Sequence, residues 1–213
     1  MAATLPDGSI VSLATTIASA KTIATLSNAS PAVAGSTAHG FSNGDLVVVA
    51  SGWGRLNQRV VKVASSLTDS FAMADIDTSS TTYFPAGSGT GTASKITAWT
   101  QISQILGFST SGGEQQFTNF SYLEDNFERQ LPTVTSAQSL QMQLADDASL
   151  AGYVALKAAS ESKAVTPLRL TLPSGAVILY NGIVSLNETP SLSKGNVMTV
   201  TATFSLQNRP VRY

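Results

Sequence analysis

Apolar and polar residues alternate in the last strand that the sequence predicts. From residue 198 to residue 206 every even position is apolar. The odd positions between them carry short hydroxyl groups, on Thr199, Thr201, Thr203 and Ser205. A period of two is typical of a β-strand with one buried and one solvated face. Ordinary solvated faces carry Lys and Glu, so this hydroxyl face predicts a strand that contacts another copy of the chain or lines a passage.

The same alternation predicts further strands in the second half of the chain. In "SLQMQLA" the apolar residues Leu140, Met142 and Leu144 share one face. The stretch "LRLTLPSGAVILYNGIVSL" predicts two strands around a Pro-Ser-Gly turn, with Gly182 at a bulge or a close backbone approach. Frequent turn signals between short strands indicate a mainly β fold.

One segment, "ADDASLAGYVALKAASES", has a helical period instead. Four apolar residues fall on one face of this helix: Leu150, Tyr153, Val154 and Ala158. Asp146 or Asp147 is expected to cap its N-terminus. The predicted fold is therefore mainly β, a sandwich or barrel with one flanking α-helix that packs its apolar face on the sheet.

The N-terminal third has shorter strands and predicts a unit of its own. Runs such as "DLVVVA", "RVVKVA" and "SFAMAD" are separated by turn-rich segments, which is typical of a small β-barrel. Its candidate core residues are Val47, Val49, Val61, Val63 and Phe71. We expect residues 20–97 to form an inserted domain and residues 1–19 and 98–213 to form the main sandwich, with a flexible linker at "PAGSGTGTAS". One continuous sandwich is the alternative.

Composition narrows the function. Charged residues make up 12% of the 213 residues, about half the usual share, and the net charge is −1. Such a chain lacks the excess positive charge with which proteins bind nucleic acid or an acidic membrane. Its low charge is typical of a protein that covers much of its surface by self-association. There is no cysteine, which excludes disulfides, thiolate zinc sites and thiol catalysis. Without a secretory signal or an apolar run of about 20 residues, we expect a soluble protein made in the cytosol.

Candidate catalytic chemistry is sparse. The one histidine, His39, lies in the turn-rich "AHGFSNGD" and is expected to be structural. Neither a G-x-S-x-G elbow nor a G-x-x-x-x-G-K-[ST] phosphate loop occurs. The pairs Asp146/Asp147 and Asp75/Asp77 lack the further ligands that a metal site needs. We therefore expect no enzyme activity, no cofactor and no metal.

An amphipathic segment, "YLEDNFERQLP", contrasts with the rest of this neutral chain. Aromatic residues beside an Arg are what protein interfaces favour, and the alternative is a hairpin folded on its own body. The candidate contact residues are Tyr122, Leu123, Glu124, Asp125, Phe127, Glu128 and Arg129. Near the C-terminus, Arg209 and Arg212 indicate a solvated tail or a basic partner for those acids on another subunit.

The order of these features resembles that of the lambda-like tail tube proteins of long-tailed bacteriophages. An acidic hairpin with "SYLED" is followed by a strand, a helix, two strands around a Pro-x-Gly turn, and a closing Thr-rich strand that ends near Arg-Pro. The resemblance covers about Trp99 to Tyr213, and it is carried by the order and spacing of the motifs.

The resemblance implies a subunit that forms hexameric rings stacked into a hollow tube, in the tail of the virion. Residues Gly112 to Ser136 match the long hairpin used between rings. The implied partners are further copies of the chain, the tape measure protein and viral DNA in the lumen, and the tail terminator and tail tip proteins, with no membrane. The Thr-rich strand is then a candidate lumen or subunit seam, because a face without Lys or Arg lets phosphate slide past.

The segment from about residue 20 to residue 98 departs from that family pattern. It looks like a small β-module that recurs in phage structural proteins, and we expect it on the tube exterior. An exterior insert would obstruct a sheath, which favours a non-contractile tail over the tube of a contractile tail or a type VI secretion system. From another class, a carbohydrate-binding or host-adhesion module would use Trp53, Trp99 and Tyr83 as exposed stacking platforms.

Overall fold

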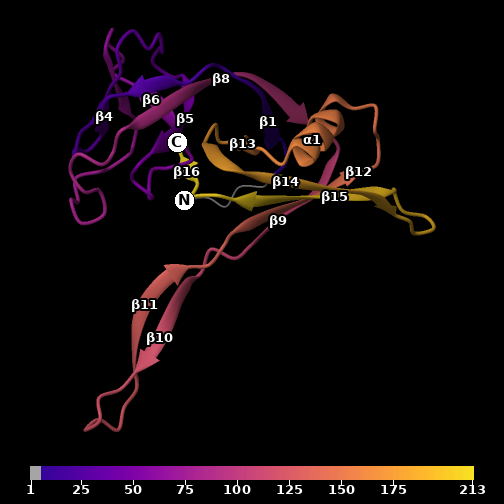
Figure 1. The fold of residues 1–213 in the computed structure, drawn as a ribbon. Helices are drawn as coiled ribbons and strands as arrows, with labels where there is room; N and C mark the ends of the chain where they lie inside the picture. Colours follow the sequence, from indigo (N-terminus) through magenta and orange to yellow (C-terminus); the bar gives the residue numbers. More distant parts are fainter. Residues whose placement is uncertain (1–5) are drawn as a thin grey trace.

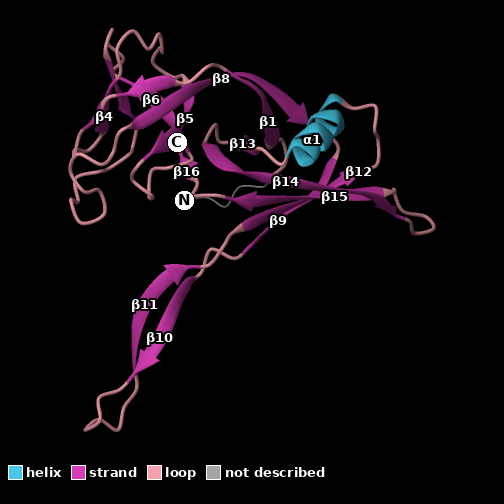
Figure 2. Cartoon of the chain, viewed as in Figure 1, coloured by secondary structure: helices cyan, strands magenta, loops and turns pink. Residues whose placement is uncertain are grey.

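The computed structural model describes residues 6–213, which form mainly β-structure with one α-helix (Figures 1 and 2). The elements are β1 (Ile10–Ile17), β2 (Lys21–Ile23), β3 (Thr25–Leu26), β4 (Ala32–Gly35), β5 (Leu46–Ser51), β6 (Arg59–Ala64), β7 (Ser70–Met73), β8 (Gly91–Ile102), β9 (Ile105–Ser111), β10 (Gln115–Phe120), β11 (Arg129–Thr135), β12 (Ser139–Ala145), α1 (Ala151–Ser162), β13 (Val165–Thr171), β14 (Val177–Ser191), β15 (Thr199–Leu206) and β16 (Val211–Arg212).

One long antiparallel sheet runs through the molecule. Its strand order is β3-β4-β7-β6-β5-β8-β1-β13-β14-β15-β12-β9, with β2 paired to β8 and β16 paired to β14. The sheet curls, so that β2 to β7 form a small unit at one side and the later strands form a second unit covered by α1 (Figure 1). Among the strands of residues 6–213, β10 and β11 alone lie outside this sheet and pair with each other.

The main core lies between the later strands and α1. Alternation along β12 and β15 places Leu140, Met142 and Phe204 against the helix side of the sheet, where all three are fully buried. This alternation confirms the predicted strands and their buried faces. Gly182 in β14 also matches its prediction, because a Cβ there would collide with the carbonyl oxygen of Ser205 in the neighbouring strand.

The helix forms where it was predicted, but its buried face is rotated. Tyr153 is buried as expected, whereas Val154 is 54% exposed and Ala158 is exposed. The side chains that meet the sheet are those of Tyr153, Leu156 and Ala159, together with the backbone of Gly152. The face that the helix presents to the sheet is therefore rotated away from Val154 and Ala158 and toward Gly152, Leu156 and Ala159.

The predicted capping of α1 by Asp146 or Asp147 is wrong. Leu150 is the N-cap residue and makes no side-chain cap hydrogen bond. Asp147 instead accepts hydrogen bonds from the backbone nitrogen and the hydroxyl of Ser149, at 3.0 and 2.6 Å. Asp147 and Ser149 thus form an Asx turn just before the helix, and the Asp147 carboxylate bonds within this turn instead of capping the helix.

The small unit has its own core. All five predicted residues, Val47, Val49, Val61, Val63 and Phe71, are buried in it, together with Trp53 and Leu56. A third cluster, which includes Ala14, Val60, Ile96 and Leu179, fills the junction between this unit and the second one. The two units are thus packed against each other through buried apolar side chains.

The expected flexible linker is ordered, and much of it is a strand. From Gly91 the chain forms β8, whose first residues pair with β5 and whose later residues pair with β1. Gly91 suits this site because a Cβ would collide with the carbonyl oxygen of Ala50 across the pair. Gly91 thus allows β8 and β5 to lie close together. The continuous strand β8 connects the two units.

The C-terminus is also ordered, which corrects the expectation of a solvated tail. Val211 is buried in the core of the small unit. The Tyr213 hydroxyl accepts a hydrogen bond from the Lys62 backbone nitrogen at 2.9 Å and donates to the Ala74 carbonyl oxygen at 3.1 Å. Burial raises the pKa of Tyr213, so the phenol stays protonated as this contact requires.

Substitution of Gly152 by Ala tests the helix–sheet contact. Ala normally stabilises a helix interior relative to Gly by about 0.5–1 kcal/mol. Here the added Cβ would lie 2.7 Å from the Gln101 carbonyl oxygen and 2.8 Å from the Ile102 Cα, both backbone atoms of β8. We expect Gly152→Ala to lower the free energy of unfolding by about 1–3 kcal/mol, measured by chemical denaturation.

The control is Gly54→Ala, because nothing lies within 4 Å of a Cβ at that site. Its unfolding free energy should stay within about 0.5 kcal/mol of the parent value. Equal stability of the Gly152→Ala variant and the parent would contradict the close contact between α1 and β8.

Candidate functional site

A two-stranded arm projects from the second unit, away from the rest of the molecule (Figure 1). It comprises β10 and β11 and leaves the sheet between β9 and β12. Gly112 and Gly113 at its base both have positive φ, at 76° and 85°, a conformation that suits Gly and turns the chain out of the sheet. Almost all side chains from Gly112 to Thr135 are exposed. The alternative of a hairpin folded on its own body is therefore wrong.

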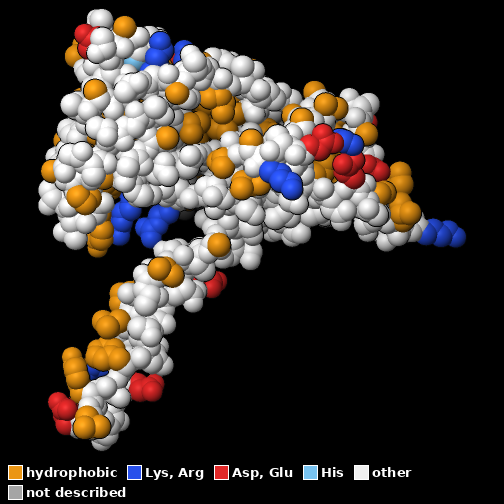
Figure 3. Space-filling view, viewed as in Figure 1, with side chains coloured by type: hydrophobic (Ala, Val, Ile, Leu, Met, Phe, Trp, Pro, Cys, Tyr) orange, Lys and Arg blue, Asp and Glu red, His pale blue; other side chains and the backbone are white. Residues whose placement is uncertain are grey.

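The arm tip holds the predicted contact residues together. Leu123 is fully exposed, Phe127 is 70% exposed and Tyr122 is 54% exposed. Arg129 lies 3.1 Å from the Asp125 carboxylate and places its guanidinium 5.4 Å from the centre of the Tyr122 ring. Apolar side chains gather along this arm in Figure 3. The tip is locally ordered by polar and cation–π contacts, and its apolar surface faces solvent.

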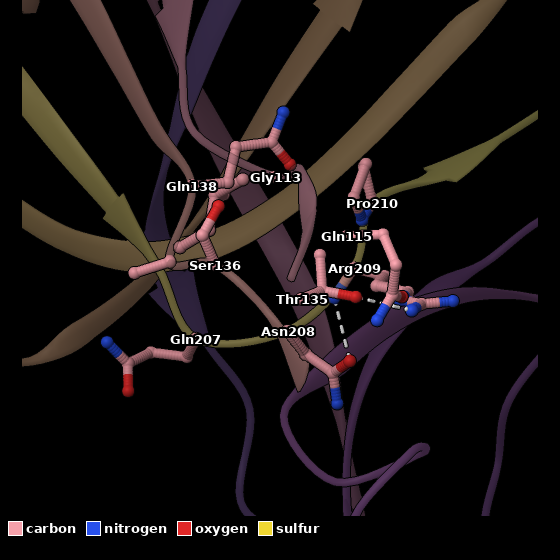
Figure 4. A pocket seen from close by; sticks show the side chains of 11 residues that line it. Gly113, Gln115, Thr135, Ser136, Gln138, Gln207, Asn208, Arg209 and Pro210 are labelled. Atoms are coloured by element: carbon pink, nitrogen blue, oxygen red, sulfur yellow. Dashed lines mark hydrogen bonds between the residues drawn. The ribbon is translucent and has the colours of Figure 1, made fainter. Parts of the chain in front are cut away.

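The C-terminal segment contacts the base of the arm. The Arg209 Nη2 atom donates to the Thr135 hydroxyl at 2.9 Å, beside the pocket drawn in Figure 4. The next residue back, Asn208, donates to the carbonyl oxygens of Gly54 and Asn57 in the small unit, at 3.0 and 2.6 Å. Adjacent residues thus connect the arm base to the small unit. Sequence reasoning could not find this contact, because its partners lie 74 to 154 residues apart.

The Thr-rich strand belongs to a larger uncharged surface. Thr199, Thr201 and Thr203 are half-buried and Ser205 is exposed, on the side of β15 opposite the core. The strand register places polar residues of β9, β12 and β14 beside them. We call this set the hydroxyl–amide face; it comprises Ser109, Ser111, Ser139, Gln141, Gln143, Ser185, Asn187, Thr199, Thr201, Thr203 and Ser205.

The hydroxyl–amide face contains no charged side chain. Its rows run across the strands, for example from Ser109 to Gln141, Thr203 and Ser185. Gln143 donates to the Thr199 hydroxyl at 3.0 Å, so neighbours in the face satisfy one another. Sequence reasoning found only the β15 part of this face. The alternation in "SLQMQLA" indicates that Gln141 and Gln143 point away from the core, but the strand order is needed to place them beside Thr203 and Thr201.

Other candidate residues have structural roles. His39 is buried; its Nε2 lies 2.8 Å from the Leu67 carbonyl oxygen, and its Nδ1 accepts from the Phe41 backbone nitrogen at 2.9 Å. Trp53 is buried and donates to the Pro85 carbonyl oxygen. Tyr83 is half-exposed beneath the Arg55 guanidinium. The buried Trp53 cannot serve as the stacking platform that a carbohydrate-binding module needs.

Within residues 6–213, no cluster of three or more His, Asp or Glu side chains could hold a metal ion. No helix in the same range is long and apolar enough to cross a membrane.

Comparison with known protein families identifies a match over most of the chain. The family model described as phage tail tube protein, TTP, matches residues 51–213, about three quarters of the chain. The match begins within the small unit and includes β6 to β16, the arm and the whole hydroxyl–amide face. No curated protein matches the chain.

Removal of the Arg209 side chain tests the hydrogen bond between Arg209 and Thr135 at the arm base. An intramolecular hydrogen bond contributes about 1 kcal/mol, which corresponds to roughly fivefold faster local opening when it is lost. We expect Arg209→Ala to accelerate amide exchange about fivefold in peptides covering residues 112–116 and 134–138, measured by hydrogen exchange with mass spectrometry. Exchange in the small-unit core should not change.

Arg212→Ala is the matched control, since Arg212 is exposed in β16 and contacts no arm residue by hydrogen bond or ion pair among residues 6–213. Identical exchange at the arm base in both variants would show that Arg209 does not hold the arm.

Proposed function

The chain belongs to the phage tail tube protein family, and from that premise we propose that it is the major tail tube subunit of a phage with a non-contractile tail. Membership of this family makes the protein a structural component of the virion tail that assembles into a tube, and not an enzyme. We propose further that the tube consists of stacked hexameric rings around a lumen for DNA passage. Its assembly would take place in the host cytoplasm.

The exposed arm is the observation that carries this proposal. It presents apolar side chains to solvent on a two-stranded ribbon that has no core of its own. Contiguous exposed apolar surface of this kind marks protein interaction sites. We propose that the arm contacts the neighbouring ring through its tip, formed by Tyr122, Leu123, Glu124, Asp125, Phe127, Glu128 and Arg129.

The hydroxyl–amide face is proposed to line the lumen, with a seam between subunits as the other use of the same surface. A lumen must let the DNA backbone pass without holding it. Lys and Arg bind phosphates by releasing counterions, so a surface that lacks them has little affinity for DNA. Thr199, Thr201, Thr203 and Ser205 supply such a surface together with the amides of β12. The tape measure protein would occupy the same passage before DNA does.

The small unit, residues 20–97, is proposed to decorate the tube exterior as an inserted domain. A core built mostly from its own residues supports this division. The shared strand β8 and the buried Val211 support a rigid attachment, so the decoration would keep one orientation on the tube. The tail terminator and tail tip proteins would bind the two ends of the tube. Arg212, which is exposed, is the candidate for a cross-subunit ion pair, whereas Arg209 already bonds Thr135.

Electron microscopy of the purified protein tests the proposal. The parent protein should form tubes or rings. Replacement of Tyr122, Phe127 and Arg129 by Ala should leave folded subunits that build no tubes, because the tip loses its apolar and cationic anchors. Circular dichroism would check that the variant is folded.

The control replaces Tyr83, Leu67 and Arg55 by Ala, three exposed side chains of similar kinds on the small unit. This variant should assemble like the parent. Full-length tubes from the tip variant would contradict the role of the arm, and compact monomers from the parent protein would contradict the tube itself.

Added positive charge tests the lumen. Lysines at Thr201 and Thr203 should slow DNA release from assembled particles at low salt, because they attract phosphate, and high salt should restore the rate. The measurement is the rate of DNA release against salt concentration. Lysines at Thr81 and Thr82, exposed on the small unit, form the control. Normal particles whose DNA release is equally fast in both variants at low salt would place the hydroxyl–amide face outside the lumen.

A further inference from the structure

We propose that a second exposed apolar surface, at the end of the sheet opposite the arm, receives the arm tip of another copy of this chain. This surface comprises Leu106, Leu192, Val197 and Met198, and we call it the acceptor patch. The inference rests on the proposed function, since it names the partner surface of the proposed arm contact.

The strand register places the arm and the acceptor patch at opposite ends of the same strands. At the arm end, Ser139 faces Ser205 on one side and Ser111 on the other. At the far end, Thr199 faces Ala145 and Ser191. Leu192 directly follows Ser191, and Met198 directly precedes Thr199. Leu106 is the second residue of β9 and lies at the same end of the sheet. The patch therefore lies one strand length from the arm base.

The acceptor patch is unusual in how much apolar surface it exposes. Leu192 is 70% exposed, Val197 63%, Leu106 57% and Met198 49%. Leu106 and Val197 also line one open pocket, together with Gln143, Ser191 and Thr199. Figure 3 shows apolar side chains at the end of the β14–β15 hairpin, far from the arm. Surface hydrophobic residues are normally scattered singly, so four of them at one end of the sheet, two of which line one pocket, indicate an interaction site.

Charge complementarity favours the arm tip as the occupant. Between Tyr122 and Arg129 the tip carries three acids and one Arg. The segment 192–198 of the acceptor patch carries Lys194 and no acid. The apolar tip, with its excess of acids, would therefore meet an apolar patch whose hairpin end carries Lys194, while Asp146 flanks the patch on the β12 side. Such opposite charges fix partner and register even where they add little affinity.

Reach also favours a second copy over the same copy. From Gly112 to Glu124 the arm can extend about 40 Å at ~3.3 Å per residue, whereas the eight residues of β15 span about 26 Å. The arm leaves the sheet at the end away from the patch and points outward (Figure 1). The tip therefore lies away from its own patch, and the arm is long enough to pass beyond the edge of a subunit stacked on the arm end.

Contact between two different surfaces of one chain has a consequence for assembly. A heterologous contact leaves one free arm and one free patch in every complex, so it continues without closing on itself unless a rotation closes a ring. Along the direction of the β12 and β15 strands this contact generates a polar stack of subunits. The two ends of the stack then differ, one presenting arms and the other presenting acceptor patches.

Cysteine cross-linking tests the pairing, because the chain has no natural cysteine. We would prepare Phe127→Cys and Val197→Cys as separate proteins, assemble each alone and as an equal mixture, oxidise them, and separate the products on a non-reducing gel. We expect at least tenfold more cross-linked dimer in the mixture than in either protein alone. Leu67→Cys replaces Val197→Cys as the control, since Leu67 is exposed to a similar extent, 70% against 63%, and lies on the small unit.

The possible outcomes separate this inference from the proposed function. Cross-linking of Phe127→Cys with itself would show an arm-to-arm contact and overturn the inference. Equal yields with Val197→Cys and Leu67→Cys would also overturn it. Tubes in the electron microscope without the mixed cross-link would overturn the acceptor patch alone, whereas a parent protein that forms no tubes or rings would overturn the proposed function as well.

A charge swap keeps the inference testable if the cysteine variants fail to assemble. Lys194→Glu should reduce tube yield at low salt, because it places an acid opposite the acidic tip. The double change Glu124→Lys and Glu128→Lys in the same chain should restore the yield. A Lys194→Glu protein that assembles like the parent at low salt, or one that the tip lysines fail to rescue, would count against the pairing.

Discussion

Backbone pairing along β8 determines the relation between the two units of this molecule. Its first residues complete the sheet of the small unit by pairing with β5, and its later residues pair with β1 in the second unit. Because strand pairing specifies register and direction, one continuous strand orients both units together. The junction cluster around Ile96 and Leu179 and the inward-turned Tyr213 reinforce this orientation. The arm, the hydroxyl–amide face and the acceptor patch are all positioned relative to this one frame.

The distribution of charge follows from a second constraint. With 12% charged residues, the chain leaves most of its surface neutral, and some of the charges pair across elements. Lys95 of β8 pairs at 2.7 Å with Asp45, the residue before β5, and Lys157 pairs with Glu188 at 2.7 Å between α1 and β14. The arm tip holds four more charged groups within eight residues. A surface this neutral is suited to burial against copies of itself, because few charges need to be desolvated.

The sequence was most informative where short-range periodicity decides the structure. The alternation in β12 and β15 predicted their buried faces, because neighbouring residues of a strand point to opposite sides whatever the partner is. The face of α1 was predicted less well. Gly152 allows the helix backbone to approach Gln101 and Ile102 closely, and this tertiary contact rotates the buried stripe away from Val154.

Features that depend on distant partners could not be predicted from local patterns. The Gly- and Ser-rich stretch before Trp99 has the composition of a linker, yet β5 converts its second half into a strand. The same holds for the candidate site. The composition of the arm tip was visible in the sequence, whereas the bond from Arg209 to Thr135 and the glutamines beside Thr201 required the strand order.

The bare ribbon of the arm has a kinetic consequence. Two strands without a covering layer are marginally stable in water, so part of the free energy that orders the arm must come from the surface that receives it. The first subunits that associate must order their arms while they form few contacts. Later subunits bind to an assembly whose end already presents the receiving surface. Subunit addition to an existing end is then faster than the start of a new assembly, which gives a few long polymers and a reservoir of free subunits rather than many short fragments.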